Sequence, residues 1–527
     1  MDAPAFADRW DRAVASVPHR PFLVWDGGSG ATESWTYQQF DHVLTEVAGW
    51  LAGAGIRAGD GVHLALPNSP AFVALWLASM RMGAWILPAD PQASAPEIRQ
   101  QVELARPRVG VCAAESARGY AEAAGLLDHL TTVDPLDPEL VPIRCPARDW
   151  DQLRRPGPGD RAAVMFTSGT TSTPKGVQVT QANYAFAGDV MAAAAALTVA
   201  HRQFVVLPLF HANAQYYSFA SAICAGASVA LMPRFSASRF MEQAARHQVT
   251  HASLFAAPMR MILARGAERV PGFSLQHVWY AQNVSDAQYQ ELTGIFGCRP
   301  RQLYGMTETI PAVLTNSALA PEPDAMGHLT LGCRVRLGDV EDGSEVPAGE
   351  AGEILVAGVP GATLFDGYLD NATATADAMR DGWFRTGDRA IVDDRGYYRF
   401  AGRGSDILKV AGENVSAVEV EDVLARHPRV LEAAVVGRPD VIRDEVPVGY
   451  VVCAPGATDL TSSALADWCA QRLAPAKRPR DIYFVPELPR TSVGKIRKFL
   501  LAGQPELAAP SPAPDSRGKT PTGGIAP

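Results

Sequence analysis

The sequence predicts an α/β protein with a large N-terminal domain of helix-covered sheets, a β-ribbon subdomain within it, and a small mobile α+β domain at the C-terminal end. Two observations lead to this prediction. Strands and helices alternate with glycine and proline breaks in residues 62–88 and again in residues 204–233, as in parallel sheets. From Phe365 onward, aspartate, glycine and aromatic residues recur at short turn spacing, which is typical of antiparallel ribbons.

The first predicted β-α-β unit begins with the short apolar strand Val62 to Pro67. The segment Ala71 to Met82 has apolar residues at helical spacing, and Gly83 can close that helix. Ala84 to Leu87 then supplies the second strand. A strand, a helix and a strand in this order predict a β-α-β unit of a parallel sheet.

A second unit repeats this order. A strand over Phe204 to Leu207 is followed by a helix over Gln215 to Cys224, a break at Gly226, and a strand over Ser228 to Met232. The repetition predicts two similar halves. The alternative is that the two pieces match only because β-α-β units are common in proteins.

The last quarter of the chain predicts a small α+β domain. Its boundary is expected at Arg403-Gly404-Ser405-Asp406, where a glycine stands among polar residues. This assigns residues 1–403 to substrate and nucleotide binding, residues 404–503 to the mobile domain, and residues 504–527 to a disordered tail. The predicted elements of the small domain are a helix over Val418 to Ala425 capped by Ser416, strands over Val430 to Val436 and Val448 to Val452, and a helix over Leu460 to Leu473.

Composition and charge narrow the classes of function. The 527 residues are 47% hydrophobic and 20% charged, which is ordinary for a soluble enzyme of about two to four domains and excludes disorder as the main state. A net charge of −9 without a long basic run argues against nucleic acid or an anionic membrane as principal partner. Seven scattered cysteines, without a signal-peptide or membrane-spanning pattern, predict a cytoplasmic protein that uses neither disulfides nor structural zinc.

The sharpest local motif is TSGTTSTPKG, residues 167–176, which follows the apolar stretch Ala162 to Phe166. Small residues allow backbone N–H groups to close around phosphate oxygens, and a lysine supplies a mobile positive charge. The motif is not a Walker loop, because it lacks the Gly-Lys-Ser/Thr ending. A flexible linker is the alternative, but a linker has no reason to follow a buried strand. The predicted phosphate-binding residues are Thr167, Ser168, Gly169, Thr170, Thr171, Lys175 and Gly176.

Four further motifs follow in order. They are Tyr304-Gly305-Met306-Thr307-Glu308-Thr309, Thr386-Gly387-Asp388, Gly402-Arg403 followed by Gly412-Glu413-Asn414-Val415, and PRTSVGK at residues 489–495. Together with the phosphate loop they resemble the adenylate-forming superfamily of acyl-CoA synthetases, luciferases and peptide-synthetase adenylation domains. The resemblance covers roughly Trp25 to Arg497, and FTSGTTSTPKG and LPLFHANAQ are most similar to the carnitine/crotonobetaine-CoA ligase branch.

The resemblance implies roles for the residues that handle ATP. A carboxylate must attack the α-phosphate, and cations have to offset the repulsion between these two anions. Lys495 is implied to bridge the carboxylate and the α-phosphate, Glu308 to bind Mg²⁺, and Thr307 to contact the α-phosphate. Tyr304 offers a face for adenine, with a core tyrosine as the alternative, and Asp388 is implied to bind the ribose hydroxyls. The resemblance assigns Arg403 to the nucleotide, and Lys409, Gly412 and Glu413 to the pantetheine path of CoA.

The resemblance also implies an acid-binding pocket. His211, in the segment PLFH, matches a position that flanks the acid in acyl- and aryl-CoA synthetases, although a lone histidine is more often structural. Because the other expected lining residues are apolar or small, we expect a fairly large hydrophobic acyl group. The predicted substrate-binding residues are Phe210, His211, Phe255, Ala256, Ala257, Ala281, Gly305 and Met306.

These motifs favour an ATP-dependent, AMP-forming acid–CoA ligase that uses Mg²⁺, with rotation of the small domain between its two half-reactions. The expected partners are a carboxylic acid, ATP, CoA and, as an assembly to test, a second copy of the chain. One alternative is an adenylation enzyme that loads a carrier protein, although an amino-acid activator generally needs an aspartate after the His211 region, and ANAQYYSF has none. The other is an acyl-adenylate-binding enzyme that performs only the thioester half-reaction.

Overall fold

The protein is described here from a computed structural model, which divides into two compact units between Ser405 and Asp406. The structure describes residues 3–28, 32–123, 125–145, 154–167, 174–403, 406–410, 413–440, 444–457, 459–490 and 496–502.

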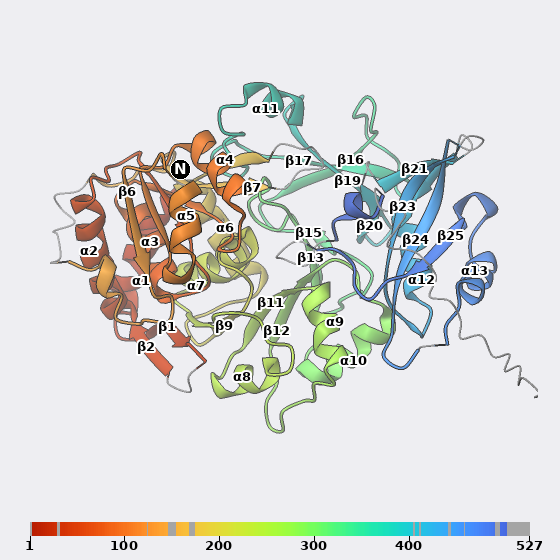
Figure 1. Ribbon diagram of the computed structural model, residues 1–527, viewed down its shortest axis with the longest axis horizontal. Coiled ribbons are helices and arrows are strands. Elements are labelled where there is room, and N and C mark those ends of the chain that lie inside the picture. Colours follow the sequence, from red (N-terminus) through yellow and green to blue (C-terminus); the bar gives the residue numbers. More distant parts are fainter. Residues whose placement is uncertain are drawn as a thin grey trace, which may run out of the picture. The chain divides into compact units, whose positions relative to one another are not determined.

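A six-stranded sheet, in the order β6-β5-β3-β4-β7-β8, contains the first predicted β-α-β unit (Figure 1). The unit is confirmed: β3 (Gly61–Ala65) and β4 (Trp85–Pro88) are parallel and α3 (Pro70–Arg81) connects them. Helix α3 begins where it does because Ser69 Oγ accepts a hydrogen bond from the Phe72 N–H at 3.2 Å. The other strands of this sheet are β5 (Val109–Ala113), β6 (His129–Val133), β7 (Arg161–Thr167) and β8 (Lys175–Thr180).

A nine-stranded sheet, in the order β15-β14-β13-β12-β11-β9-β10-β1-β2, contains the second unit. Strands β9 and β10 pair in parallel as expected. The run from β13 to β1 is parallel, so the carboxyl ends of these strands lie along one edge of the sheet. The strands are β1 (Pro21–Asp26), β2 (Thr32–Thr36), β9 (Arg202–Val205), β10 (Ser228–Leu231), β11 (His251–Phe255), β12 (His277–Ala281), β13 (Arg301–Tyr304), β14 (Leu314–Thr315) and β15 (His328–Leu329).

The helix between β9 and β10 differs from the regular helix predicted over residues 215–224. It begins earlier, as a π-helix η4 (Asn213–Ala220), and becomes an α-helix only at α7 (Ser221–Ala225). The Ser221 hydroxyl donates to the Tyr217 carbonyl at 2.6 Å, which diverts a carbonyl from the regular backbone ladder. Periodicity of apolar residues does not reveal such a local change of winding, and π-helical turns are frequent at functional sites.

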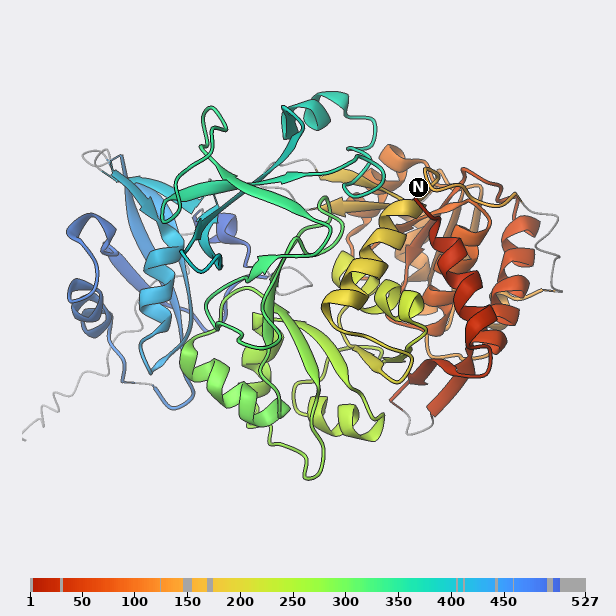
Figure 2. The same ribbon diagram turned by 180° about the vertical axis from the view of Figure 1, so that it is seen from behind.

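Helices cover both sheets in layers (Figures 1 and 2). The largest core joins β3, β10 and β1 with the helices between the two sheets. A smaller core lies on the other face of β3, under α4 and α5, and a third lies on the other face of the nine-stranded sheet, under α8 to α10. No helix in the described part of the chain is long and apolar enough to cross a membrane. The helices are α1 (Phe6–Ser16), α2 (Tyr37–Gly53), α4 (Ala95–Ala105), α5 (Ala117–Ala123), α6 (Gln181–Ala194), α8 (Phe240–Arg246), α9 (Ala256–Ala264) and α10 (Asp286–Phe296).

The predicted antiparallel ribbon is present as a third sheet of the first unit, in the order β16-β17-β19-β18, with β20 paired to β19. It includes the short helix α11 (Ala372–Ala378), which the sequence analysis read as part of the ribbon. Its strands are β16 (Arg334–Gly338), β17 (Ala351–Ala357), β18 (Met379–Arg380), β19 (Trp383–Val392) and β20 (Tyr398–Arg403).

The second unit is the predicted small α+β domain, a sheet in the order β22-β21-β24-β23 with β25 beside β24. Its first helix begins as expected, because Ser416 Oγ accepts a hydrogen bond from the Glu419 N–H at 3.4 Å. The fold class predicted from the sequence is therefore confirmed. The elements are β21 (Ile407–Val410), β22 (Glu413–Ser416), α12 (Ala417–Ala425), β23 (Val430–Asp440), β24 (Asp444–Cys453), α13 (Ser462–Ala470), β25 (Asp481–Phe484) and α14 (Lys498–Ala502).

Candidate active site

The carboxyl ends of neighbouring parallel strands gather the predicted acid-binding residues. Strands β11, β12 and β13 lie side by side and end at Phe255, Ala281 and Tyr304. Phe255 and Ala281 are directly paired. The crevice outside the carboxyl ends of parallel strands is where open α/β sheets bind ligands. Residues that the sequence assigned to one pocket thus lie along one edge of one sheet. They are Phe255, Ala256, Ala257, Ala281, Gly305 and Met306.

Gly305 occupies a place where no larger side chain fits. A Cβ atom there would lie 2.8 Å from Tyr217 Oη and 2.9 Å from the Pro311 carbonyl oxygen. Since Tyr217 belongs to η4, this glycine allows the π-helix and the loop after β13 to approach each other closely. Just before η4, the rings of Phe210 and His211 lie with centroids 4.3 Å apart. The predicted acid site is therefore bounded by η4 and the loop after β13, at the sheet edge.

A tight turn after Gly305 presents the two residues predicted to contact the phosphate and the metal. The Met306 N–H donates to Thr309 Oγ1 at 3.0 Å, and the Thr309 N–H donates to the Met306 carbonyl at 3.2 Å. Thr307 and Glu308 are the two central residues of this turn. Only 4% of Glu308 is exposed. A buried carboxylate requires a partner, because burial penalises its charged form.

Tyr368 supplies one partner and links Glu308 to the lysine of the phosphate loop. The Tyr368 hydroxyl donates to Glu308 Oε1 at 3.1 Å, and Lys175 Nζ lies 4.9 Å from the centre of the Tyr368 ring. The Phe365 N–H donates to the Glu308 carbonyl at 3.0 Å, which fixes the segment that carries the tyrosine. Burial and the negative charge of Glu308 raise the pKa of Tyr368, so its hydroxyl remains a donor.

The phosphate loop connects two paired strands. Strand β7 ends at Thr167, β8 begins at Lys175, and these two residues are partners in the antiparallel register. The Leu369 N–H donates to the Gly176 carbonyl at 2.7 Å, so β8 also lies against the segment that contains Tyr368. Both flanks of the predicted phosphate loop are thus held near Glu308. Its inner residues Ser168, Gly169, Thr170 and Thr171 lie outside the described part of the chain.

The predicted ribose-binding carboxylate lies on β19 between two donors. The Tyr304 hydroxyl donates to Asp388 Oδ2 at 2.7 Å, and Arg403 Nε donates to Asp388 Oδ1 at 2.5 Å. Asp388 and Arg403 are directly paired across β19 and β20, so the strand register brings them together. Burial, and next the Asp388 charge, raise the pKa of Tyr304. A carboxylate offers about four acceptor positions, which leaves capacity for ribose hydroxyls.

A single carboxylate fits the magnesium ion that the family resemblance implies. Within the described ranges, no group of three or more histidine, cysteine, aspartate or glutamate side chains is placed to hold a metal. Mg²⁺ does not need such a cage, because it keeps several waters and binds through one or two carboxylates together with substrate phosphates. Glu308, in the turn beside the hairpin that carries the phosphate loop, meets that requirement.

Four other predicted contact residues come from the last quarter of the chain. Lys495 and Gly412 lie outside the described residues. Lys409 is on β21 and Glu413 begins β22, and their backbones belong to one antiparallel pair of strands. The predicted roles of these residues remain predictions.

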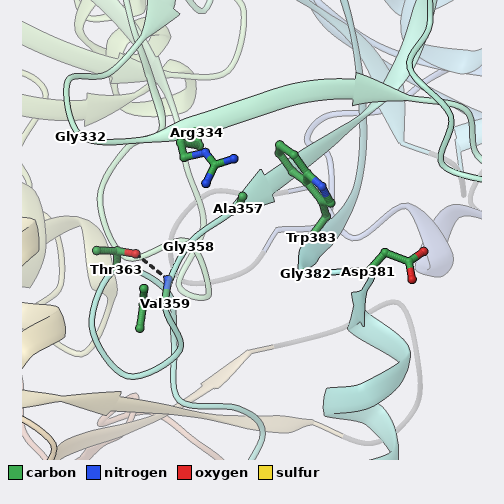
Figure 3. A pocket seen from close by; sticks show the side chains of 9 residues that line it. All are labelled: Gly332, Arg334, Ala357, Gly358, Val359, Thr363, Asp381, Gly382 and Trp383. Carbon is green, nitrogen blue, oxygen red and sulfur yellow. Dashed lines mark hydrogen bonds between the residues drawn. The ribbon is translucent and has the colours of Figure 1, made fainter.

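A cavity of about 350 Å³ lies on the antiparallel ribbon and includes none of the predicted site residues (Figure 3). Trp383, which begins β19, forms one wall, and Arg334 lies 5.9 Å from its ring. Asp388 is five residues farther along the same strand, so about 16 Å separates it from Trp383. The cavity is therefore distinct from the ribose carboxylate. Its lining residues are Gly332, Arg334, Ala357, Gly358, Val359, Thr363, Asp381, Gly382 and Trp383.

Sequence reasoning missed Tyr368 and the polar residues of η4. Tyr368 stands in FDGYLD, where turn-forming neighbours indicated only a ribbon, and its contact with Glu308 spans 60 positions. Asn213 and Tyr217 stand in ANAQYYSF, where the lack of an aspartate is the only feature on which a prediction rests. The sequence signal that could have identified the residues of η4 is the presence of polar side chains in a helix that is otherwise buried.

Comparison with known proteins agrees with this geometry. Residues 10–369 match the family described as AMP-binding enzyme, and residues 419–495 match the AMP-binding enzyme C-terminal domain. The crotonobetaine/carnitine–CoA ligase of Escherichia coli is 30% identical over 509 residues, covering 92% of this chain and 96% of that protein. The chain therefore belongs to the AMP-binding enzyme family.

Two solved structures show the same fold. ATP-bound MatB from Rhodopseudomonas palustris has a TM-score of 0.85 at 26% identity, covering 95% of this chain and 98% of that one. The o-succinylbenzoate CoA synthetase (MenE) of Bacillus subtilis, in complex with its acyl-adenylate intermediate, has a TM-score of 0.82 at 25% identity, covering 97% and 100%. These similarities place the chain among adenylate-forming acyl-CoA synthetases.

Proposed function

We propose that this protein is an ATP-dependent, AMP-forming acid–CoA ligase whose substrate is a bulky, mainly apolar carboxylic acid. The ligase class rests on the family and on relatives that are themselves CoA ligases. The observation that carries the proposal is spatial: one sheet edge carries Phe255 and Ala281, and the loop after the neighbouring strand β13 carries Glu308. Acid activation requires an apolar wall for the acyl group. It also requires a carboxylate that can hold the metal ion at the phosphates.

In the proposed first half-reaction, the acid carboxylate attacks the α-phosphate of ATP and pyrophosphate leaves with its electron pair. Glu308 would hold Mg²⁺, which would supply positive charge to offset the charge of the phosphates. Lys495 is proposed to neutralise the approaching carboxylate and Thr307 to donate to the α-phosphate. Asp388 holds the ribose through hydroxyl hydrogen bonds. Tyr304 keeps Asp388 oriented through its own hydroxyl, which donates at 2.7 Å.

In the proposed second half-reaction, the CoA thiolate attacks the acyl carbonyl of acyl-AMP and AMP leaves. The hairpin of β21 and β22, which carries Lys409 and Glu413, is proposed to line the path of pantetheine. Rotation of the small domain about Arg403 to Asp406 would exchange this hairpin for Lys495 between the two steps. We propose a cytoplasmic homodimer as the working form of the enzyme, to be tested by light scattering.

The named relatives include ligases for crotonobetaine and carnitine, yet we expect carnitine to be a poor substrate here. Recognition of a quaternary ammonium favours a carboxylate that pairs with its positive charge. The predicted lining consists of small and apolar groups together with one histidine, and it contributes no carboxylate. The predicted lining residues are Phe210, His211, Phe255, Ala256, Ala257, Ala281, Gly305 and Met306.

The test measures the two half-reactions separately over a panel of acids that includes carnitine and bulky apolar acids. Acid-dependent exchange between ATP and pyrophosphate reports adenylation, and CoA thioester formed from supplied acyl-AMP reports the second step. The proposal expects both activities with apolar acids. Thioester formation without exchange for any acid would instead identify an enzyme of the second step alone. Exchange without thioester formation from CoA would favour a carrier-protein thiol as acceptor.

A further inference from the structure

The carboxamide of Asn213 is buried without a full set of protein partners. Only 7% of the residue is exposed, and its Oδ1 atom has no hydrogen-bond partner among the described residues. A buried polar atom without a partner is costly, and native proteins retain few of them. Such an atom at a binding site indicates that a ligand supplies the missing hydrogen bond.

Asn213 lies at the predicted acid site. It is the first residue of η4, two positions after His211. A π-helix closes its hydrogen bonds between residues five apart, so residues four or five apart lie on nearly the same side, and Asn213 and Tyr217 are four apart on η4. That side meets the loop after β13, because Tyr217 Oη lies 2.8 Å from the position of a Cβ on Gly305. The side chain of Asn213 is therefore on the face of η4 that borders the acid site.

Two nearby polar side chains, Gln215 on η4 and Ser221 at the start of α7, are satisfied within the protein. Gln215 Nε2 donates to the Leu209 carbonyl at 2.6 Å, and Gln215 Oε1 accepts from the Tyr184 hydroxyl. Ser221 Oγ donates to two carbonyls of η4, at 2.6 and 3.0 Å. The contacts of Gln215 and Ser221 fix the helix, whereas the amide of Asn213 keeps hydrogen-bonding capacity for another molecule.

We propose that Asn213 binds a hydroxyl or amide substituent on the acyl part of the acid substrate. This inference rests on the proposed function and narrows its substrate class to mainly apolar acids that carry one hydrogen-bonding group away from the carboxylate. An amide side chain both donates and accepts, so it matches a hydroxyl or amide, which also do both. A site built around such a hydrogen bond discriminates strongly against analogues that lack it.

The experiment compares kcat/KM for matched pairs of acids in the full adenylation and thioester reaction. The pairs are para-hydroxyphenyl- and para-methylphenyl-propanoic acid, and an ω-hydroxy and an ω-methyl straight-chain acid of equal length. The wild-type enzyme should prefer the hydroxyl member of at least one pair by about tenfold, the scale of one buried hydrogen bond. Asn213→Leu, which has nearly the same shape, should abolish or invert that preference.

Gln243→Met is the matched control, because Gln243 on α8 also has a buried amide oxygen without a partner among the described residues. It should keep the wild-type preference. Asn213→Ser, which supplies a hydroxyl in place of the amide, should keep part of the preference for the hydroxyl acid. It provides a second test if the leucine variant does not fold. Equal kcat/KM within every pair for the wild type, or an unchanged preference in Asn213→Leu, would overturn the inference. Absence of thioester with all acids would instead contradict the proposed function.

Discussion

The nucleotide side and the acid side of the candidate site differ in how their buried polar groups are satisfied. On the nucleotide side, Asp388 accepts hydrogen bonds from Tyr304 and Arg403. On the acid side, Asn213 Oδ1 has no partner among the described residues. Under the proposed roles, the protein itself orients the carboxylate that would hold the ribose of ATP, whereas the acid would complete the hydrogen bonding of its own pocket. A carboxylate that is already oriented lowers the free-energy cost of ordering side chains when the nucleotide binds.

The largest expected effect is that of Lys495→Ala. Removing one positive charge from the reaction between two anions should lower acyl-AMP formation by about two orders of magnitude or more. Thioester formation from supplied acyl-AMP should fall much less, because the proposed rotation of the small domain exchanges Lys495 for the hairpin of β21 and β22 before that step. Single-turnover assays of the two steps check this prediction. Equal losses in both would contradict the role proposed for Lys495.

The second prediction concerns the carboxylate of the nucleotide side. Asp388→Asn retains the shape of the side chain but removes the charge that pairs with Arg403. We expect kcat/KM for ATP to fall roughly ten- to hundredfold, the scale of a lost charge-assisted hydrogen bond. The order of preference among acids should not change. Asp394→Asn, at an exposed carboxylate of the turn between β19 and β20, is the matched control and should leave ATP kinetics unchanged.

The third prediction concerns the close approach on the acid side. Gly305→Ala places a methyl group 2.8 Å from Tyr217 Oη and 2.9 Å from the Pro311 carbonyl oxygen and the Ala312 Cα, so the π-helix or the loop must move. We expect kcat/KM for the acid to fall about tenfold, since misplacing a pocket wall by a few tenths of an ångström costs about 1 to 3 kcal/mol. Steady-state kinetics at saturating ATP measure it.

Gly294→Ala provides the control for that substitution. Gly294 lies within α10, and a Cβ there has nothing within 4 Å. Its replacement should leave activity unchanged and stabilise the helix by up to about 1 kcal/mol. If Gly305→Ala behaved in the same way as Gly294→Ala, the contact between η4 and the loop after β13 would have no part in acid binding.

The smallest expected effect on activity concerns the amino-terminal ends of the parallel strands whose carboxyl ends carry the predicted acid-binding residues. His251 begins β11, and its ring lies 4.6 Å from that of His201 and 5.2 Å from that of His277, beside Arg301. Its Nδ1 faces the Thr250 hydroxyl and its Nε2 faces the Ala195 carbonyl. Burial lowers the pKa of His251 to about 4, against an ordinary value of 6.5.

Because the folded state disfavours protonated His251, its contribution to stability is complete above pH 6.5 and is lost as the pH falls toward 4. A shift of this size corresponds to about 3 kcal/mol. The melting temperature should therefore decrease between pH 6.5 and pH 4, and His251→Asn should show a shallower decrease. Calorimetry over this pH range measures it. An equally steep decrease in the variant would show that other groups dominate the acid response.

The sequence predicted those parts of the site that depend on local patterns. The strand before the phosphate loop and the cap at Ser416 are set by residues close together in the chain, and the structure contains both of them. The sequence did not predict the register that pairs Asp388 with Arg403, because a β-bulge separates the two halves of the ladder between β19 and β20. The contact between Tyr368 and Glu308 depends on packing between distant segments.

The winding of η4 shows a further limit. The predicted helix over residues 215–224 followed the period of an ordinary α-helix, whereas Ser221 binds backbone carbonyls and the first turns are π-helical from Asn213. Side-chain competition for carbonyls is decided by packing and leaves little trace in the hydrophobic pattern. This change of winding also determines which residues face Gly305, so the polar wall of the acid site could not be predicted from the sequence.

The most direct test of the contrast between the two sides is a crossed kinetic measurement on Asp388→Asn and Asn213→Leu. For each variant, the KM for ATP and the ranking of the acid panel are measured in the same assay. The account predicts a raised KM for ATP with an unchanged acid ranking in Asp388→Asn, and a changed acid ranking with an unchanged KM for ATP in Asn213→Leu. A changed acid ranking in Asp388→Asn, or a raised KM for ATP in Asn213→Leu, would contradict it.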